Sequence, residues 1–128
     1  MGDRGNMQEK KQDPEKLKER TKQYALRVVR VAESLPRNRV AQIIVDQLVR
    51  SGTSVGANYR AACRAKSRAD FISKMGTVEE EADESLYWME ILIGAGLMHN
   101  EQLAALMQEG EELLSIVVSS IITARKNR

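Results

Sequence analysis

Apolar residues recur every three or four positions through four separate segments of this chain, and this spacing most constrains its fold. A step of seven residues returns to nearly the same side of an α-helix, so each segment predicts one apolar helix face. The first two faces comprise Leu17, Thr21, Tyr24, Val28, Val31 and Leu35, then Val40, Ile44, Leu48, Ser51, Val55, Tyr59 and Ala62. The last two comprise Phe71, Met75, Val78, Ala82, Leu86, Met89 and Ile93, then Leu103, Leu106, Gly110, Leu113, Val117, Ile121 and Ala124.

Signals for helix ends separate these segments. Residue types that cap helix N-termini precede all four, namely Asp13, Asn38, Ser67 and Asn100. Pro36 ends the first segment, and the glycine-rich residues 94–96 end the third. The short connections make neighbouring helices antiparallel, and the seven-residue spacing favours bundle packing. The sequence thus predicts an all-α, antiparallel, up-down four-helix bundle as a single domain over residues 13–128, after a disordered lead-in over residues 1–12.

Cysteine content and hydropathy indicate the compartment. The single cysteine, Cys63, cannot form an internal disulfide, which fits a reducing environment, and we expect it to be a small buried residue. No apolar run approaches the roughly 20 residues that span a bilayer, and the polar N-terminus is unlike a secretory signal. We therefore expect a cytoplasmic protein without a membrane partner.

The segment RSGTSVGANYR poses a choice between a phosphate-binding loop and a helix built from small residues. A Walker loop needs four residues between its glycines and a lysine after the second, whereas three residues separate Gly52 from Gly56 and Ala57 follows. The preceding residues have helical spacing, so the strand that a dinucleotide-binding turn requires is also missing. We interpret both glycines as helix positions one turn apart that let another helix approach closely, either within the chain or between subunits.

No residues have the spacing of a catalytic, cofactor or metal site. The carboxylates between Glu79 and Glu84 would need Glu-x-x-His pairs on facing helices to hold two metal ions. The only histidine, His99, lies instead in a predicted turn. The sequence therefore predicts a protein that is not an enzyme and uses no cofactor.

Charge is distributed unevenly along the chain. Residues 1–70 carry 16 basic and eight acidic residues, whereas residues 71–128 carry four basic and ten acidic residues. The densest basic segment follows the two glycines, and we expect a solvated helix end that pairs internally or contacts nucleic-acid phosphates. No aromatic residue is interleaved with it, so base stacking is not indicated. The candidate nucleic-acid-binding residues are Arg60, Arg64, Lys66 and Arg68.

The acidic segment offers an internal partner for these cations. We predict that one of three glutamates pairs with an arginine of the second helix, which would account for part of the charge asymmetry. The glutamates are Glu80, Glu81 and Glu84, and the arginines are Arg50, Arg60 and Arg64.

Adjacent aromatic residues suggest a contact surface on the third helix. Tyr87 and Trp88 lie roughly 100° apart around a helix, so that one suits the core and the other an interface. The candidate helix-packing or interface residues are Gly52, Gly56, Tyr59 and Trp88.

Two runs of residues carry a resemblance to a known family. The run QLVRSGTSVGANYRAACRAKSRADFISKMG, followed by EEEADESLYWMEIL, resembles the bacterial four-helix bundle proteins that include those encoded by intervening sequences in 23S ribosomal RNA genes. The likeness extends roughly from Tyr24 to Leu97 and implies an up-down bundle, a ring-like homopentamer and no transferable catalytic activity. A more distant similarity is to the basic pentameric accessory proteins of diversity-generating retroelements, which work with a reverse transcriptase and its RNA. The acidic run EEEADE departs from those basic proteins.

Three functional hypotheses remain open. The first is a non-catalytic homopentameric assembly module that binds RNA or a nucleoprotein partner, such as a reverse transcriptase complex, through its basic surface. The second is a protein–protein adaptor without a nucleic-acid role, and the third is an enzyme with a site at a subunit interface. Charge placement separates the first two, because pairing of the acidic segment with the basic one would favour the adaptor.

Overall fold

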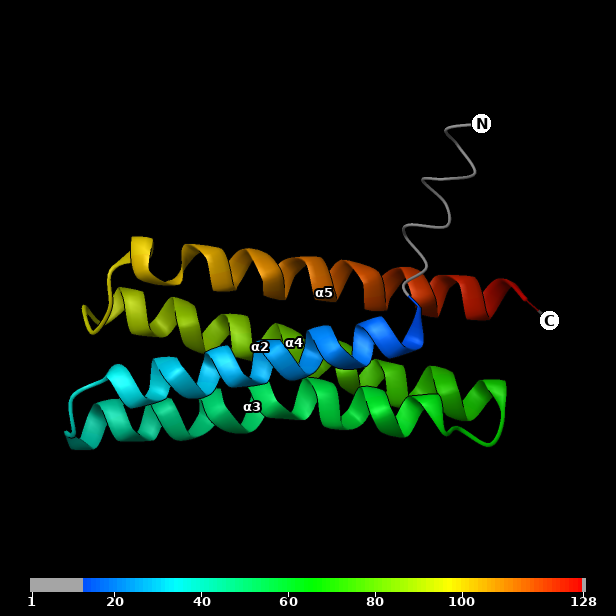
Figure 1. Ribbon diagram of the computed structural model, residues 1–128, viewed down its shortest axis with the longest axis horizontal. Coiled ribbons are helices and arrows are strands. Elements are labelled where there is room, and N and C mark those ends of the chain that lie inside the picture. Colours follow the sequence, from blue (N-terminus) through cyan, green and yellow to red (C-terminus); the bar gives the residue numbers. More distant parts are fainter. Residues whose placement is uncertain (1–12, 128) are drawn as a thin grey trace.

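The computed structural model describes residues 13–127, which form four helices packed in one bundle (Figure 1). The helices are α2 (Pro14–Ser34), α3 (Arg39–Cys63), α4 (Arg68–Gly94) and α5 (Asn100–Lys126). Consecutive helices run in opposite directions, so the start of α2, the α3–α4 turn and the end of α5 lie at the same end of the molecule (Figure 1). The predicted antiparallel four-helix bundle is confirmed, and the predicted lead-in lies outside the described residues.

Side chains of the predicted types cap the helices, with one difference. The Asp13 carboxylate accepts a hydrogen bond from a first-turn N–H of α2 at 2.9 Å, and the Asn38 side chain does the same for α3 at 2.9 Å. At α5, however, the cap position is His99 rather than Asn100, so that prediction is wrong by one residue. The reason is a reciprocal bond that starts the helix earlier, in which the His99 backbone N–H donates to the Gln102 side chain at 2.8 Å.

Helix α4 ends at the predicted glycine signal. Gly96 has a φ of 74°, a left-handed conformation that other residues adopt at a cost. Its N–H donates to the Ile93 carbonyl at 3.0 Å, and the Leu97 N–H donates to the Leu92 carbonyl at 3.0 Å. This pair of bonds is a Schellman motif, which satisfies the last carbonyls of the helix and turns the chain back toward α5.

The four apolar faces meet in one core that runs along the bundle. Most of the residues in the predicted faces are buried, but Val40 is 61% exposed and Ala41 is fully buried in its place. The reason is helical geometry. Ala41 lies seven residues before Leu48 and is rotated from it by only about 20° around the helix axis, whereas Val40 lies eight residues before Leu48 and is rotated by about 80°. The seven-residue repeat therefore predicts most of the core, but near the end of α4 the fully buried residue is Leu92 and not the predicted Ile93, which is partly buried.

Tyr24 joins three helices within this core. Its side chain is 1% exposed, and its hydroxyl shares a 2.7 Å hydrogen bond with the Ser85 hydroxyl of α4. A side chain built at Gly110 of α5 would come within 2.8 Å of the same hydroxyl. Burial raises the pKa of Tyr24 to about 12, so the phenol stays neutral and its hydrogen bond persists at neutral pH.

Candidate functional site

The four candidate nucleic-acid-binding residues lie together around the α3–α4 turn. Arg60 is in the last turn of α3, Arg64 caps that helix, Lys66 lies in the turn, and Arg68 begins α4. All four are exposed, and no acidic residue lies between the first and the last of them. The α5 residues Arg125 and Lys126 lie at the same end of the bundle (Figure 1). We call the surface formed by Arg60, Arg64, Lys66 and Arg68 the basic end.

Local hydrogen bonds hold the turn that carries these cations. The Ser67 hydroxyl accepts the Asp70 N–H at 3.0 Å, as expected for the predicted cap. The Asp70 carboxylate in turn accepts the Lys66 N–H at 3.0 Å. A hydrogen bond from the Lys74 ammonium and then that backbone bond hold the pKa of Asp70 below its usual value. Asp70 is therefore bonded to its own turn and to Lys74, while its charge also acts on Lys66 and offsets part of the positive charge of the basic end.

The acidic segment pairs with α3 at Arg50, away from the basic end. The Arg50 guanidinium lies 3.2 Å from a Glu81 oxygen and also contacts the Glu84 carboxylate. Hydrogen bonds from Arg50 and then from the Trp88 indole hold the pKa of Glu84 below its usual value. The predicted pairing of helix-two arginines with this segment is thus confirmed for Arg50. Among residues 13–127, the ion pairs include none of the four residues of the basic end.

A second ion-pair network joins the first and last helices and was not predicted. Arg20 of α2 donates two hydrogen bonds to Glu109 of α5, at 2.9 and 2.6 Å, and one to Glu112 at 3.1 Å. The Arg20 and Glu109 side chains are partly buried. A separation of 89 residues in sequence leaves no local pattern that could have revealed this pair.

Gly52 and Gly56 both lie inside α3 and face α2. A β-carbon at Gly52 would lie 2.9 Å from a Val28 methyl, and one at Gly56 would lie 3.0 Å from the Thr21 hydroxyl oxygen. Both glycines are buried, so of the two interpretations left open by the sequence, the structure shows close packing within the chain. The absence of side chains lets α2 and α3 approach each other over this turn.

The two candidate aromatic residues have different surroundings. Tyr59 is 5% exposed and lines a cavity at the basic end. Trp88 is partly buried, and its indole N–H donates to Glu84 at 3.0 Å. The Tyr87 ring packs edge-on against Trp88, with ring centroids 5.1 Å apart, and is the more exposed of the two. Neither residue of this pair belongs to the buried core, in contrast to the expectation that one would.

Cys63 is exposed rather than buried, so that expectation is wrong. It is the last residue of α3 and lies at the end of the bundle, next to the exposed cap residue Arg64. The thiol lines the same cavity as Tyr59.

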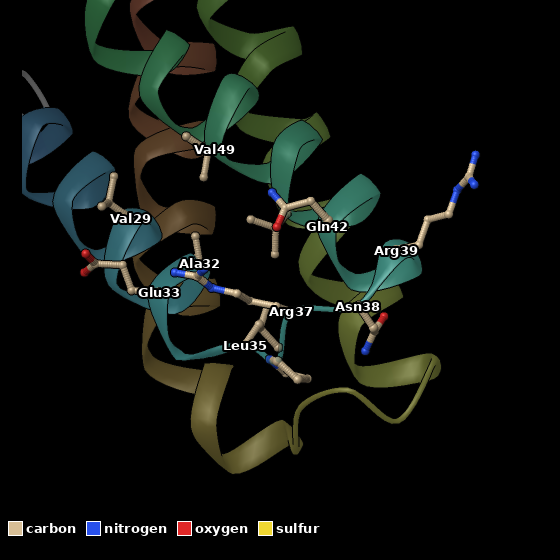
Figure 2. Close-up of a pocket in the computed structure, with 11 residues that line it drawn as sticks. Val29, Ala32, Glu33, Leu35, Arg37, Asn38, Arg39, Gln42 and Val49 are labelled. Atoms are coloured by element: carbon tan, nitrogen blue, oxygen red, sulfur yellow. The ribbon is translucent and has the colours of Figure 1, made fainter.

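A groove of about 770 Å³ runs between α2 and α3 near the other end of the bundle. Figure 2 shows Val29 and Ala32 from α2 and Val49 from α3 lining the groove, whereas Arg39 points away from it. The groove therefore combines an apolar strip between the two helices with polar residues, which include Glu33 of α2 and Gln42 of α3 as well as residues of the α2–α3 turn.

Residues 13–127 offer neither a cluster of metal-binding side chains nor a membrane-spanning helix. No group of three or more His, Cys, Asp or Glu side chains in this part of the chain is arranged to hold a metal ion. None of its helices combines the length and the apolar character needed to cross a bilayer.

Comparisons with known proteins agree on one family. The family model described as "23S rRNA-intervening sequence protein" matches residues 15–119. A crystal structure of a protein of unknown function from the S23 ribosomal protein family of Bacteroides thetaiotaomicron is 34% identical to the chain, with a TM-score of 0.79. The match covers 84% of this chain and 96% of that one. No protein with curated annotation matches.

Proposed function

Because the chain belongs to the family of 23S rRNA-intervening sequence proteins, we propose that it is a non-catalytic module that assembles with copies of itself. In this proposal the module binds the phosphate backbone of RNA through its basic end. The observation that carries the proposal is the separation of charge. The acidic segment is paired with Arg50 on the side of the bundle, while the four cations of the basic end are exposed and share no ion pair within residues 13–127. Among the hypotheses left open by the sequence, this separation favours RNA over an adaptor role.

Clustered cations suit a phosphate backbone better than a particular base sequence. Each neutralised phosphate releases counterions, which supplies affinity without sequence preference. Three of the four cations lie on five consecutive residues, Arg64 to Arg68, so one strand could contact them in succession. Self-assembly would repeat this cluster in every subunit and enlarge the cationic surface.

Self-assembly is supported by two apolar surfaces on different helices. Rings join subunits through unlike faces, so each subunit must offer two of them. One is the groove between α2 and α3, which Val29 and Val49 line. The other is the pair of Tyr87, which is 53% exposed, and Trp88 on α4. We propose that these two surfaces meet in a homo-oligomer, with a pentamer as the specific expectation.

Light scattering coupled to size-exclusion chromatography tests the assembly. We expect a mass about five times the 14.4 kDa of one chain. Substituting Val49→Glu should produce smaller species, because it places a charge in the apolar groove. The matched substitution Gln108→Glu, at an exposed position of α5 outside the groove, should leave the mass unchanged. A monomeric wild-type protein at micromolar concentration would contradict the proposal.

A salt titration of binding to a structured RNA tests the basic end. The triple variant Arg64→Ala/Lys66→Ala/Arg68→Ala should bind more weakly, and its plot of log K against log salt should be shallower by about 0.7 to 0.9 for each lost phosphate contact. A matched variant, Lys22→Ala/Arg27→Ala/Arg30→Ala, removes three cations of α2 that belong neither to the basic end nor to the lining of the groove. It should bind nearly as the wild type does, if its oligomeric mass is also unchanged.

Equally weak binding by the wild type and both variants would reject the basic end as a site. The adaptor hypothesis would then lead, with the surface of Tyr87 and Trp88 as the contact to examine next. A reduction by both triple variants to the same extent would indicate attraction by overall charge instead of a localised site.

A further inference from the structure

A cavity of about 490 Å³ opens within the basic end. All four helices contribute to its lining, which includes Leu17 of α2, Tyr59 of α3, Phe71 of α4 and Ser120 of α5. It therefore exists only where the start of α2, the α3–α4 turn and the end of α5 come together. Its size is within the range of pockets that hold small organic groups, roughly 300 to 1,000 Å³.

The walls of this cavity combine apolar and aromatic surface with a few polar groups. Phe71 is partly exposed and packs against the core, and the fully buried Met75 lies one turn further along the same helix. The lining residues with polar side chains include Tyr59, Cys63 and Ser67. Burial and then the adjacent Cys63 thiol raise the pKa of Tyr59. Its hydroxyl is therefore neutral at physiological pH and can donate and accept hydrogen bonds.

The rim of the cavity is built by an alternating sequence. Cys63, Ala65 and Ser67 line the cavity, and the residues between and after them, Arg64, Lys66 and Arg68, are exposed. Small residues thus line the pocket, and an exposed cation follows each of them in sequence. The apolar and aromatic lining therefore lies close to several positive charges.

We propose that this cavity receives one unpaired base of an RNA strand whose neighbouring phosphates bind the cations of the rim. The proposal deepens the function proposed above and rests on it. A nucleotide has the matching chemistry, with a flat base that stacks on aromatic surface, polar edges that hydrogen-bond, and an attached anionic phosphate. The mixed lining, in which polar side chains stand beside aromatic and apolar ones, fits the polar edges of a base better than it fits an acyl chain.

The sequence alone pointed away from stacking because no aromatic residue lies among the four cations. The fold changes this, since Tyr59 directly precedes Arg60 and Phe71 follows Arg68 by three residues. Helix α3 ends and α4 begins between these two aromatics, which brings both into the lining of one cavity.

Binding of the full-length protein to two RNA probes tests the pocket. One probe is a short single strand with a 2-aminopurine at its centre, and the other is a fully paired duplex of the same length. We expect the wild type to prefer the single strand and to quench its 2-aminopurine emission on binding. Phe71→Leu keeps apolar volume but removes the aromatic face, so affinity for the single strand should fall about tenfold. Its affinity for the duplex should not change.

The variant Phe71→Tyr provides the matched control, because it retains the ring and should retain both affinity and quenching. Phe71→Leu that binds and quenches the single strand as the wild type does would overturn the pocket while leaving backbone binding intact. Loss of affinity for both probes to the same extent would also overturn it, since a folding defect or general weakening would explain that result. No binding of either probe by the wild type would overturn both the pocket and the proposed function.

Discussion

Replacing Tyr24 with alanine is expected to lower the free energy of unfolding by about 3 to 5 kcal/mol, the usual cost of deleting a large buried aromatic side chain. Tyr24 is the largest fully buried side chain and contacts helices on two sides. A domain of this size is stable by about 5 to 15 kcal/mol, so the variant should be near the limit of folding. Urea unfolding followed by circular dichroism, at one fixed protein concentration because of the expected self-assembly, measures the change.

The matched variant Tyr24→Phe separates packing from hydrogen bonding. It keeps the ring in place and removes only the 2.7 Å bond to Ser85. The Ser85 hydroxyl still donates to the Ala82 carbonyl at 2.7 Å, so no buried group loses its last partner. We therefore expect a loss of only about 1 kcal/mol. Equal losses for the phenylalanine and alanine variants would show that the hydroxyl, and not the ring, supports the core.

Replacing Gly56 with leucine is expected to lower the free energy of unfolding by about 1 to 3 kcal/mol or more, because it overpacks the contact between α2 and α3. Even a β-carbon at this position would lie 3.0 Å from the Thr21 hydroxyl oxygen and 3.4 Å from the Thr21 backbone carbon. The longer leucine side chain would have to displace the α2 backbone or leave the core side of the helix. Thermal unfolding and light scattering together report the loss of stability and any change in assembly.

Gly76→Leu is the control for this substitution. Gly76 lies inside α4, and a β-carbon there would meet nothing within 4 Å. Leucine should be tolerated at this position and should gain up to about 1 kcal/mol of helix propensity. If Gly56→Leu melted at the wild-type temperature, the small residues of α3 would not be needed for close packing.

The sequence by itself determined the number of helices, their order and most of the core. A seven-residue apolar repeat specifies a helix face without knowledge of any distant residue, and polar caps and glycine signals act on the backbone next to them. These are local effects, so they predicted the helix ends near Asp13, Asn38 and Gly96. The basic segment and the acidic one can likewise be read directly from the order of residues.

Only the tertiary structure decided which of these segments meet. The choice of Arg50 over Arg60 and Arg64 as the partner of the acidic segment depends on how far α4 lies alongside α3, and not on sequence spacing. The ion pair between Arg20 and Glu109 joins the first and last helices. The cavity at the basic end likewise needs residues from all four helices. Such contacts depend on the rotation and axial position of whole helices. These are set by the packing of the entire core, so no short stretch of sequence encodes them.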